Sequence, residues 1–365
     1  MPFDNLAEAG LVDGIDVFGA RTLTHLQGWL NGAAQLDEPV ARSGIEAEPA
    51  AELADVVGQT QARFAVEVAA AGGHHLMLTG PPGVGKTMLA QRLPGLLPPL
   101  TGEESLEVTA IHSVAGLLST DTPLITRAPF VAPHHSSSVA ALVGGGVGMA
   151  RPGAVSRAHR GVLFLDECAE IGVSALEALR TPLEDGEIRL ARRDGVACYP
   201  ARFQLVLAAN LCPCAPADPQ DCLCAAAAKR RYLGKLSGPL LDRVDLRVQM
   251  HQVRAAAMSA QAGESTALVR ARVAEARRVA AQRWQPYGVR TNAEVSGTLV
   301  RRRFRPGTAA MAPLRTALDR GMLSIRGVDR TLRVAWTLAD LAGRDCPGLD
   351  EVSTALSFRQ SGVTR

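Results

Sequence analysis

The sequence predicts an α/β fold in which helices flank a parallel sheet, followed by a helical domain at the C-terminus. The sheet is indicated by short apolar runs at residues 76–78, 161–165 and 203–209, each of which ends at glycine or polar residues. Such runs are typical of strands that are buried on both faces, as in parallel sheets. The helical domain is indicated by segments rich in Ala, Leu and Arg, with helical spacing, from residue 253 onward.

The composition is that of an ordinary globular protein. Of its residues, 47% are hydrophobic and 21% are charged, a balance that allows a sizeable core. A length of 365 residues gives room for two or three domains. The first residues show no secretory signal, and no stretch approaches the ~18 uncharged apolar residues of a membrane span. We therefore expect a cytoplasmic protein without membrane contact. In that reducing compartment, the seven cysteines are expected to be thiols or metal ligands rather than disulfides.

Charge is distributed unevenly along the chain. Residues 1–252 hold 20 basic and 27 acidic residues, a net charge of −7, whereas residues 253–365 hold 19 basic and 9 acidic residues, a net charge of +10. A basic C-terminal part is compatible with binding to nucleic acid or to an acidic neighbouring subunit. Charge alone does not decide between these two partners.

A motif of the form G-x-x-x-x-G-K-[ST] directly follows the first apolar run. Its residues are Gly80, Pro81, Pro82, Gly83, Val84, Gly85, Lys86 and Thr87. In this motif the glycines let backbone N–H groups point at phosphate oxygens, Lys86 reaches the β- and γ-phosphates, and the Thr87 hydroxyl coordinates Mg²⁺. A helix expected over residues 86–93 would face the phosphates with its N-terminus. The alternative is a Gly-Pro turn that matches the pattern by chance.

Two later apolar runs end in polar side chains that suit the same site. Asp166 and Glu167 follow the run at 161–165, and Asn210 follows the run at 203–209. Ligands of open parallel sheets bind at the carboxyl ends of the strands. We expect Asp166 to hold the Mg²⁺ shell, Glu167 to orient or deprotonate the attacking water, and Asn210 to sense the γ-phosphate.

Arg243 lies at the end of an expected helix beyond the third run and is a candidate arginine finger. In that role it would reach the nucleotide of a neighbouring subunit and stabilise charge in the transition state. The alternative is an ion pair within the chain, with Asp242 or Asp245.

Four cysteines stand directly after the third run, in the pairs Cys212/Cys214 and Cys222/Cys224. Four thiolates are able to close a tetrahedral Zn²⁺ site. Because C-x-C spacing is tighter than the usual C-x-x-C, free thiols remain the alternative. For His134 and His135, a polar insertion exposed to solvent or substrate is favoured over a metal site.

The remaining segments are interpreted more coarsely. Residues 11–20 alternate loosely like a strand, residues 37–49 resemble a linker, and residues 94–160 form a long connection with little periodicity. Asp194-Gly195 predicts a tight hairpin whose tip, with Arg192 and Arg193, either contacts a phosphate backbone or is merely solvated. Helices are expected over residues 23–30, 51–71 with a break at Gly58, 174–183, 265–284, 308–321, 326–343 and 350–359.

With these motifs in place, the chain resembles the AAA+ ATPases of the magnesium-chelatase-like group, in particular the ComM/YifB type. Beyond the motifs above, the likeness is carried by the segments Asp55-Val56-Val57-Gly58-Gln59, Ile111-His112-Ser113-Val114-Ala115-Gly116, Pro133-His134-His135, Arg151-Pro152-Gly153-Ala154, Leu240-Leu241-Asp242-Arg243 and Ser324-Ile325-Arg326-Gly327. It covers nearly everything from about residue 53 to the C-terminus.

The resemblance implies a homo-hexameric ring that binds ATP and Mg²⁺ between its subunits. It assigns Lys86 and Thr87 to nucleotide and Mg²⁺ binding, Asp166 and Glu167 to the Walker B pair, Asn210 to sensor 1 and Arg243 to the finger. Arg326 would be sensor 2, with Arg330 and Arg333 as rivals. It further implies an AAA+ core over residues 47–252 and a helical lid over 253–365. Residues 1–46 would be a linker and the remnant of an N-terminal Lon-like domain.

Proteins of the ComM type are expected to engage DNA, with the segments around residues 111–155 and 187–197 facing a central pore. The leading hypothesis is therefore an ATP-driven DNA motor for helicase action or branch migration in recombination or natural transformation. The alternative is the motor subunit of a magnesium-chelatase-type metal-insertion complex. A scaffold that does not hydrolyse ATP is disfavoured by the presence of Glu167 and Arg243.

Overall fold

The computed structural model describes residues 1–10, 14–39, 51–118, 124–145, 150–192, 195–253 and 263–360. The chain divides into two compact units, one of Met1–Pro49 with Pro99–Arg127 and one of Ala50–Pro98 with Ala128–Arg365. The larger unit contains all of the candidate site residues. The domain boundaries expected after residues 46 and 252 stay predictions.

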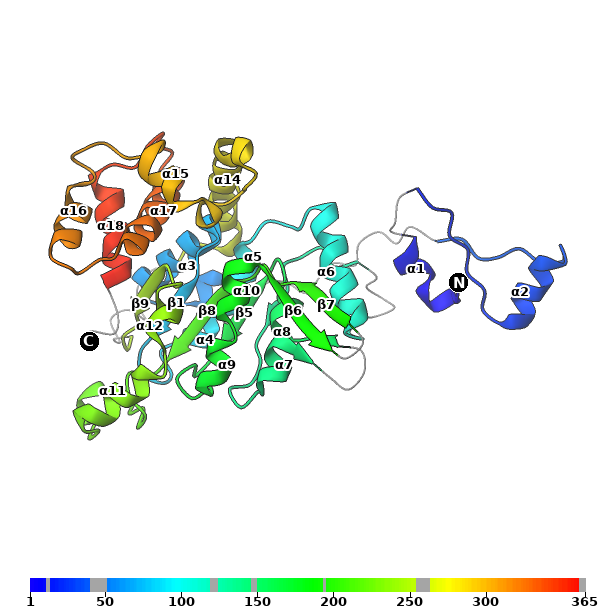
Figure 1. Ribbon diagram of the computed structural model, residues 1–365, viewed down its shortest axis with the longest axis horizontal. Coiled ribbons are helices and arrows are strands. Elements are labelled where there is room, and N and C mark those ends of the chain that lie inside the picture. The colour runs from blue at the N-terminus through cyan, green and yellow to red at the C-terminus, as the bar shows by residue number, and fades with distance from the viewer. Residues whose placement is uncertain are drawn as a thin grey trace. The chain divides into compact units, whose positions relative to one another are not determined.

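A five-stranded parallel sheet forms the centre of the larger unit (Figure 1). Its strands are β1 (Leu76–Thr79), β2 (Phe130–Val131), β5 (Val162–Leu165), β8 (Gln204–Ala209) and β9 (Leu246–Gln249). They lie in the order β2-β5-β8-β1-β9, and every neighbouring pair is parallel. The carboxyl ends of all five strands therefore lie at one edge, where the segments after β5, β8 and β1 are neighbours. The three expected strands are confirmed, whereas β2 and β9 were not anticipated.

Both faces of the sheet are covered, which explains the continuous apolar runs. Alternate strand residues point to opposite faces: Leu76 and Leu78 enter one hydrophobic core, and Met77 enters the other. The first core includes residues of α3 (Thr60–Gly72) and the C-terminal helices, and the second includes residues of α8 (Ala154–Arg157), α9 (Val173–Glu177) and α12 (Gly238–Leu241).

The helices of this α/β part are mostly short. They are η2 (Leu53–Asp55), α3 (Thr60–Gly72), α4 (Lys86–Ala90), α5 (Leu93–Leu96), α7 (Val139–Val143), α8 (Ala154–Arg157), α9 (Val173–Glu177), α10 (Arg180–Asp185), η3 (Pro219–Asp221), α11 (Ala226–Gly234) and α12 (Gly238–Leu241). The single helices expected over 86–93 and 174–183 are each divided. The break expected at Gly58 within 51–71 is confirmed: Gly58 and Gln59 both have positive φ, which an α-helix does not accommodate.

A helical domain follows the sheet, as expected. Its elements are α14 (Thr266–Trp284), η4 (Gln285–Tyr287), η5 (Asn292–Glu294), α15 (Gly297–Arg302), α16 (Ala312–Asp319), α17 (Ile325–Leu341) and α18 (Leu349–Gln360). Helices α14 and α17 pack on α3, and α18 packs on α17 and β9. Trp284 is fully buried and makes edge contacts with Phe304 and Trp336. The core of this domain is therefore continuous with one face of the sheet.

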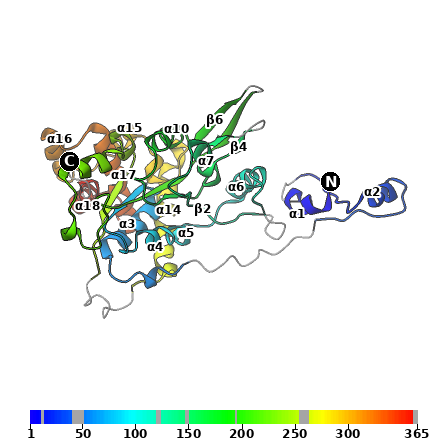
Figure 2. The same cartoon turned by 90° about the horizontal axis from the view of Figure 1, so that it is seen from below.

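Two small antiparallel hairpins accompany the sheet. One pairs β3 (Gly144–Gly145) with β4 (Arg151–Pro152), and the other pairs β6 (Glu187–Arg192) with β7 (Gly195–Pro200). Figure 2 shows the β6–β7 hairpin extending away from the central sheet. This confirms the hairpin expected from Asp194-Gly195, but residues 193–194 and the side chain of Arg192 lie outside the described residues, so the contact expected at the tip stays a prediction.

The smaller unit contains η1 (Phe3–Asn5), α1 (Leu6–Ala9), α2 (Leu23–Leu30) and α6 (Gly102–Val114). Helix α2 has the expected bounds, but the strand expected over residues 11–20 is wrong for the described residues 14–20, which form only isolated bridges. Helix α6 lies within residues 94–160, which the sequence predicted to be a long connection, so this helix was not anticipated. Its start is a capping box in which Thr101 and Glu104 bond each other's backbone N–H groups.

Residues 40–50, which include most of the expected linker, lie outside the described part of the chain. Within that part, no helix combines the length and the apolar character that crossing a bilayer demands.

Candidate active site

The phosphate-binding motif forms a loop between strand β1 and helix α4. Gly83 and Gly85 adopt φ values of 76° and 92°, a left-handed conformation that favours glycine. Gly85 is the N-cap residue of α4, and Lys86 is its first helical residue. The loop therefore has the backbone that the motif requires for turning its N–H groups toward an anion.

The side chain of Lys86 folds back over this loop. Its Nζ donates to the carbonyl oxygens of Gly80 and Pro81, at 2.7 and 2.8 Å, and to Oδ1 of Asn210 at 2.9 Å. Burial lowers the pKa of the Lys86 ammonium, and the nearby carboxylates of Asp166 and Glu167 partly offset that shift. The lysine and the candidate sensor are thus already in contact, although 124 residues separate them in sequence.

The Thr87 hydroxyl meets the carboxylate at the end of β5. Its Oγ1 donates to Oδ2 of Asp166 at 2.5 Å. Hydroxyl and carboxylate oxygens are the hard ligands that Mg²⁺ prefers, so the two side chains fit the ion that the motif implies. Because β5, β8 and β1 are consecutive in the sheet, Asp166, Asn210 and the loop meet at one edge.

Glu167 follows Asp166 and takes a strained conformation. Its φ of 46° lies in the left-handed region, which is sparsely populated by residues other than glycine. One of its carboxylate oxygens lies 3.1 Å from Nδ1 of His135, in the segment after β2. A cavity of about 360 Å³ is lined by Thr87, Asp166, Glu167, His134 and His135, among others. The turn after β5 therefore directs a carboxylate to a cavity shared with Thr87 and Asp166.

The contact of His135 with Glu167 was not anticipated from the sequence. The sequence predicts a histidine pair exposed to solvent or substrate, and in the structure both histidines line the cavity, where His135 also contacts the candidate catalytic carboxylate. The only group of potential metal ligands found among the described residues is composed of cysteines, so the metal alternative for this pair gains no support. The only signal in the sequence was the histidine pair itself, because the two-residue strand β2 before it was not anticipated.

Arg243 lies at the opposite edge of the sheet. It precedes β9, whose Leu246 pairs with Leu76 at the start of β1, whereas the phosphate-binding loop follows the end of β1. The guanidinium is buried; it donates to the Pro239 carbonyl at 2.6 Å and pairs with the Glu184 carboxylate.

The alternative for Arg243, an ion pair within the chain, is confirmed in kind, but its partner is Glu184 rather than Asp242 or Asp245. Asp242 pairs with Arg359 and Asp245 pairs with Arg330, so both carboxylates are engaged by other arginines. The sequence did not identify Glu184 as the partner of Arg243, because the two residues are 59 positions apart.

The three candidates for sensor 2 all lie on α17 but in different surroundings. Arg326 is exposed in the first turn of the helix. Arg330 donates to Asp245 at the amino edge of the sheet, away from the phosphate-binding loop of its own chain. Arg333 is partly buried, and its buried Nε has no hydrogen-bond partner. Burial lowers its pKa.

The two cysteine pairs come together in the segment after β8. The Sγ atoms of Cys212, Cys214 and Cys222 lie 3.4–3.5 Å apart, and those of all four cysteines, including Cys224, lie within 4.8 Å of one another. A second cavity is lined by residues of both this cluster and the phosphate-binding loop, among them Pro81, Asn210, Cys212 and Cys222.

Comparisons with known proteins agree with these features. The family model "Magnesium chelatase, subunit ChlI" matches residues 52–258, and the model of the C-terminal part of that subunit matches residues 263–359. An uncharacterized protein of Mycobacterium tuberculosis (strain H37Rv) is 81% identical over all 365 residues, which span 73% of that protein.

Two further relatives are more distant in sequence. YifB of Salmonella typhimurium is 40% identical over 98% of this chain and 70% of its own length. The competence protein ComM of Haemophilus influenzae is 37% identical over 97% of this chain and 70% of its own length. Together with the fold and the nucleotide loop, these matches show that the chain belongs to the magnesium-chelatase-like AAA+ family, in the branch that contains YifB and ComM.

Proposed function

We propose that this chain is an ATP-hydrolysing ring motor that acts on DNA. The observation that carries the ATPase part is the meeting of Lys86, Thr87, Asp166 and Asn210 at one sheet edge, next to the Glu167 carboxylate. This set contains a cation for the phosphates, two oxygen ligands for Mg²⁺ and a base for water, which are the parts that phosphoryl transfer to water requires. Family membership supports the same activity.

In the proposed mechanism, Lys86 exchanges the loop carbonyls for phosphate oxygens when the nucleotide binds. Thr87 and Asp166 are the residues that would hold Mg²⁺, which neutralises phosphate charge. Glu167 accepts a proton from the attacking water, and the Asn210 amide orients that water or the γ-phosphate. The pairing of Glu167 with His135 supports a role for the segment after β2 in setting the direction of the base.

The position of Arg243 supports a ring. An arginine at the amino edge of the sheet cannot serve the phosphate-binding loop at the carboxyl edge of its own sheet. It is able to serve the loop of a second copy, as arginine fingers supplied by a neighbouring molecule do. When every site is completed by the next subunit, the contact repeats head to tail, and it forms a ring if the rotation between subunits closes; we propose a homo-hexamer. Arg326, which is exposed, is our candidate for sensor 2.

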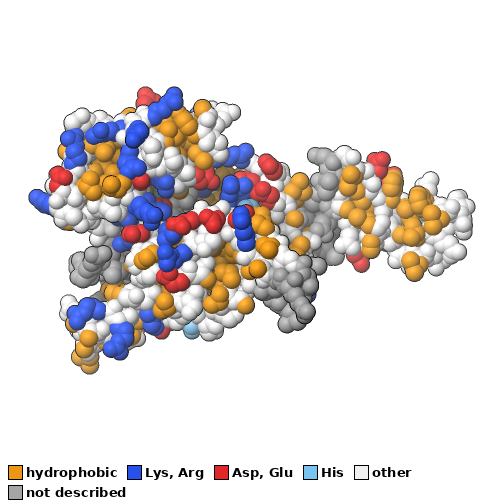
Figure 3. Space-filling model, viewed as in Figure 1, with side chains coloured by type: hydrophobic (Ala, Val, Ile, Leu, Met, Phe, Trp, Pro, Cys, Tyr) orange, Lys and Arg blue, Asp and Glu red, His pale blue; other side chains and the backbone are white. Residues whose placement is uncertain are grey.

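DNA is proposed as the partner on two grounds. ComM, a relative along nearly the whole chain, is a competence protein, and the C-terminal region has a net charge of +10. Figure 3 shows Lys and Arg side chains distributed over the C-terminal helices. The exposed arginines of this region include Arg270, Arg302, Arg303, Arg305 and Arg320. Helicase or branch-migration activity would follow from translocation along such a partner.

The second candidate function is that of the ATPase subunit of a metal-insertion complex, and the magnesium chelatase family models favour it. The ATPase rate with and without single- and double-stranded DNA, measured across a salt series, separates the two. A DNA motor is expected to show stimulation that weakens as salt rises, because binding to phosphates releases counterions. A rate that does not respond to either DNA at any salt concentration would favour the metal-insertion alternative.

We further propose that the four clustered cysteines bind Zn²⁺. A tetrahedral Zn²⁺ with bonds of ~2.3 Å places its sulfur ligands about 3.8 Å apart, close to the Sγ separations in the cluster. Such an ion would hold the segment after β8 in one conformation. Asn210 lies only two residues before Cys212, so the ion would also limit the movement of Asn210. The role is structural, because four thiolates leave no coordination position open.

Elemental analysis of the purified chain is expected to find stoichiometric zinc. Replacing Cys222 with serine removes one ligand and should abolish zinc retention and lower the melting temperature, since zinc binding in such sites is coupled to folding. Cys198→Ser is the matched control, because Cys198 is exposed and lies outside the cluster. Equal zinc content in both variants, or a chain that takes up no zinc from zinc-containing buffer, would contradict this proposal.

A further inference from the structure

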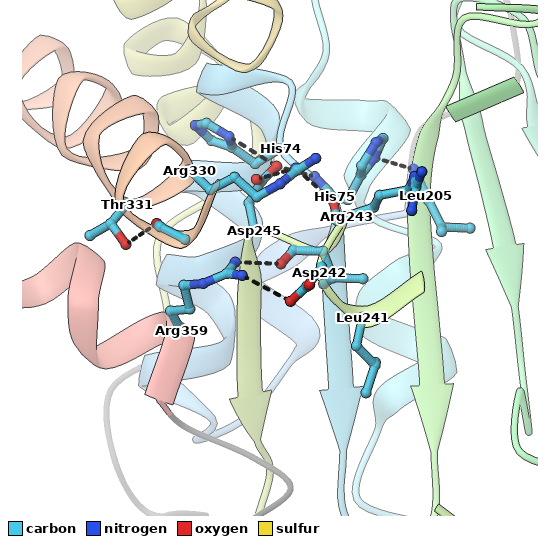
Figure 4. A network of polar contacts seen from close by, with 12 residues as sticks. His74, His75, Leu205, Leu241, Asp242, Arg243, Asp245, Arg330, Thr331 and Arg359 are labelled. Carbon is cyan, nitrogen blue, oxygen red and sulfur yellow. Dashed lines mark hydrogen bonds and ion pairs between the residues drawn. The ribbon is translucent and has the colours of Figure 1, made fainter. Parts of the chain in front are cut away.

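The segment Asp242–Asp245, which contains the proposed arginine finger, is held by two arginines of the C-terminal helices. Figure 4 shows Arg330 of α17 and Arg359 of α18 pointing toward this segment from the helical side. The segment is four residues long and joins α12 to β9. Its backbone position determines where the Arg243 side chain begins.

Arg330 binds the segment on both sides of Val244. Its Nη1 donates to the backbone carbonyl of Arg243 at 2.8 Å and to the Asp245 carboxylate at 2.7 Å. Arg359 adds a second hold: its Nη1 donates to the carbonyl of Val244 at 3.3 Å, and its Nη2 lies 3.4 Å from the Asp242 carboxylate. Two consecutive carbonyls are thus bound by guanidinium groups from two helices that lie more than 80 residues further along the chain.

Asp245 anchors this arrangement to the sheet. Its carboxylate accepts from the backbone N–H of His75 at 3.3 Å and lies 3.4 Å from Nδ1 of His74, whose Nε2 contacts the Thr337 hydroxyl of α17 at 2.7 Å. Burial opposes ionisation of Asp245, but Arg330 and His74 outweigh it and hold the pKa of this carboxyl well below its usual value. The Asp245 side chain is 2% exposed, so an ionised carboxylate that lost Arg330 would be left poorly compensated.

We infer that Arg330 and Arg359 are positioning residues for Arg243, through which the C-terminal helices set the geometry of the neighbouring subunit's active site. The inference rests on the proposed role of Arg243 as a finger. It makes Arg330 a support for the finger rather than a sensor of the nucleotide, because its guanidinium is committed to Asp245 and the Arg243 carbonyl. A movement of α17 or α18 would then change hydrolysis next door without any contact between these helices and that nucleotide.

Arg330→Gln and Arg359→Gln, made in the full chain, are expected to lower kcat while leaving ATP affinity unchanged. A displacement of ~1 Å at a catalytic group can cost about 10²-fold in rate, and we expect a loss of that order for Arg330→Gln. Arg330→Lys should give a smaller loss, because an ammonium can keep the Asp245 contact but not the forked geometry. Arg344→Gln is the matched control: it loosens the Arg344–Glu351 pair at the start of α18 but does not touch the segment.

Mixed oligomers distinguish positioning from general support of the fold. A Lys86→Ala chain retains a normal finger and an Arg243→Ala chain retains a normal nucleotide loop, so co-expression of the two is expected to restore ATPase activity at some subunit interfaces. Arg330→Gln should behave like Arg243→Ala: it recovers activity with Lys86→Ala and fails to recover it with Arg243→Ala. Arg359→Gln provides the same comparison if Arg330→Gln does not fold, as judged by thermal melting.

The outcomes separate two failures. If Lys86→Ala and Arg243→Ala do not complement each other, the shared site is wrong and the basis of this inference is lost with it. If they do complement, but the Arg330 and Arg359 variants recover activity with Arg243→Ala, hydrolyse ATP at the normal rate, or lose ATP affinity rather than kcat, then the positioning role is contradicted while the shared site stands.

Discussion

Replacing Arg243 with alanine is expected to lower the kcat for ATP hydrolysis by about 10³-fold or more, the effect typical of arginine fingers. In the single chain, the guanidinium is buried against Pro239 and Glu184. Because the Glu184 side chain is 56% exposed, the ion pair is open to competition from a stronger anion such as a neighbouring γ-phosphate. Loss of the cation removes charge stabilisation from the transition state and spares the groups that bind ATP.

Steady-state ATPase rates together with equilibrium binding of a fluorescent ATP analogue test this prediction. Arg278→Ala is the control, because it removes an arginine whose only described ion pair is with Glu275 on the exposed side of α14. A kcat reduced only as much as in the control, or a loss confined to nucleotide binding, would be incompatible with a finger.

The second large effect is expected for Glu167→Gln. General-base catalysis contributes about 10²–10⁴-fold to a rate, so the amide variant should bind ATP normally and hydrolyse it slower by that factor. The glutamine keeps the size of the side chain but cannot accept the proton of the attacking water. The variant should therefore accumulate oligomers that contain uncleaved ATP.

Glu170→Gln supplies the matched control for this prediction. Glu170 lies three residues further along the same turn, where its carboxylate pairs with Lys235 at 3.5 Å. Single-turnover hydrolysis of radiolabelled ATP compares the two variants. Normal hydrolysis by Glu167→Gln would show that another group is the base.

The parts of the site that are encoded locally could be predicted from the sequence. The phosphate-binding loop depends on glycines at fixed spacing, and the buried strands are visible as apolar runs because both faces of the sheet are covered. The positions of Asp166 and Asn210 at strand ends were predicted in the same way, because each follows an apolar run directly. The order β2-β5-β8-β1-β9, which makes their loops neighbours, confirmed the expected fold.

Contacts between distant segments could not be predicted in this way. Nothing near Glu167 identifies His135 as its neighbour, and nothing near Arg243 identifies Glu184, because these pairs form only when separate elements pack together. Asp242 and Asp245 were the natural candidates for Arg243 by proximity in sequence, yet Arg359 and Arg330 occupy them. Helix α6, by contrast, was predictable, since Thr101 and Glu104 have the spacing of a capping box.

Release of phosphate from ATP by the purified chain, compared with Lys86→Ala, tests most directly whether Lys86, Asp166 and Asn210 form a hydrolytic site. We expect Mg²⁺-dependent hydrolysis by the unchanged chain and none above background by Lys86→Ala, with equal melting temperatures. Hydrolysis that persists in Lys86→Ala, or no binding of ATP by the folded unchanged chain, would contradict it.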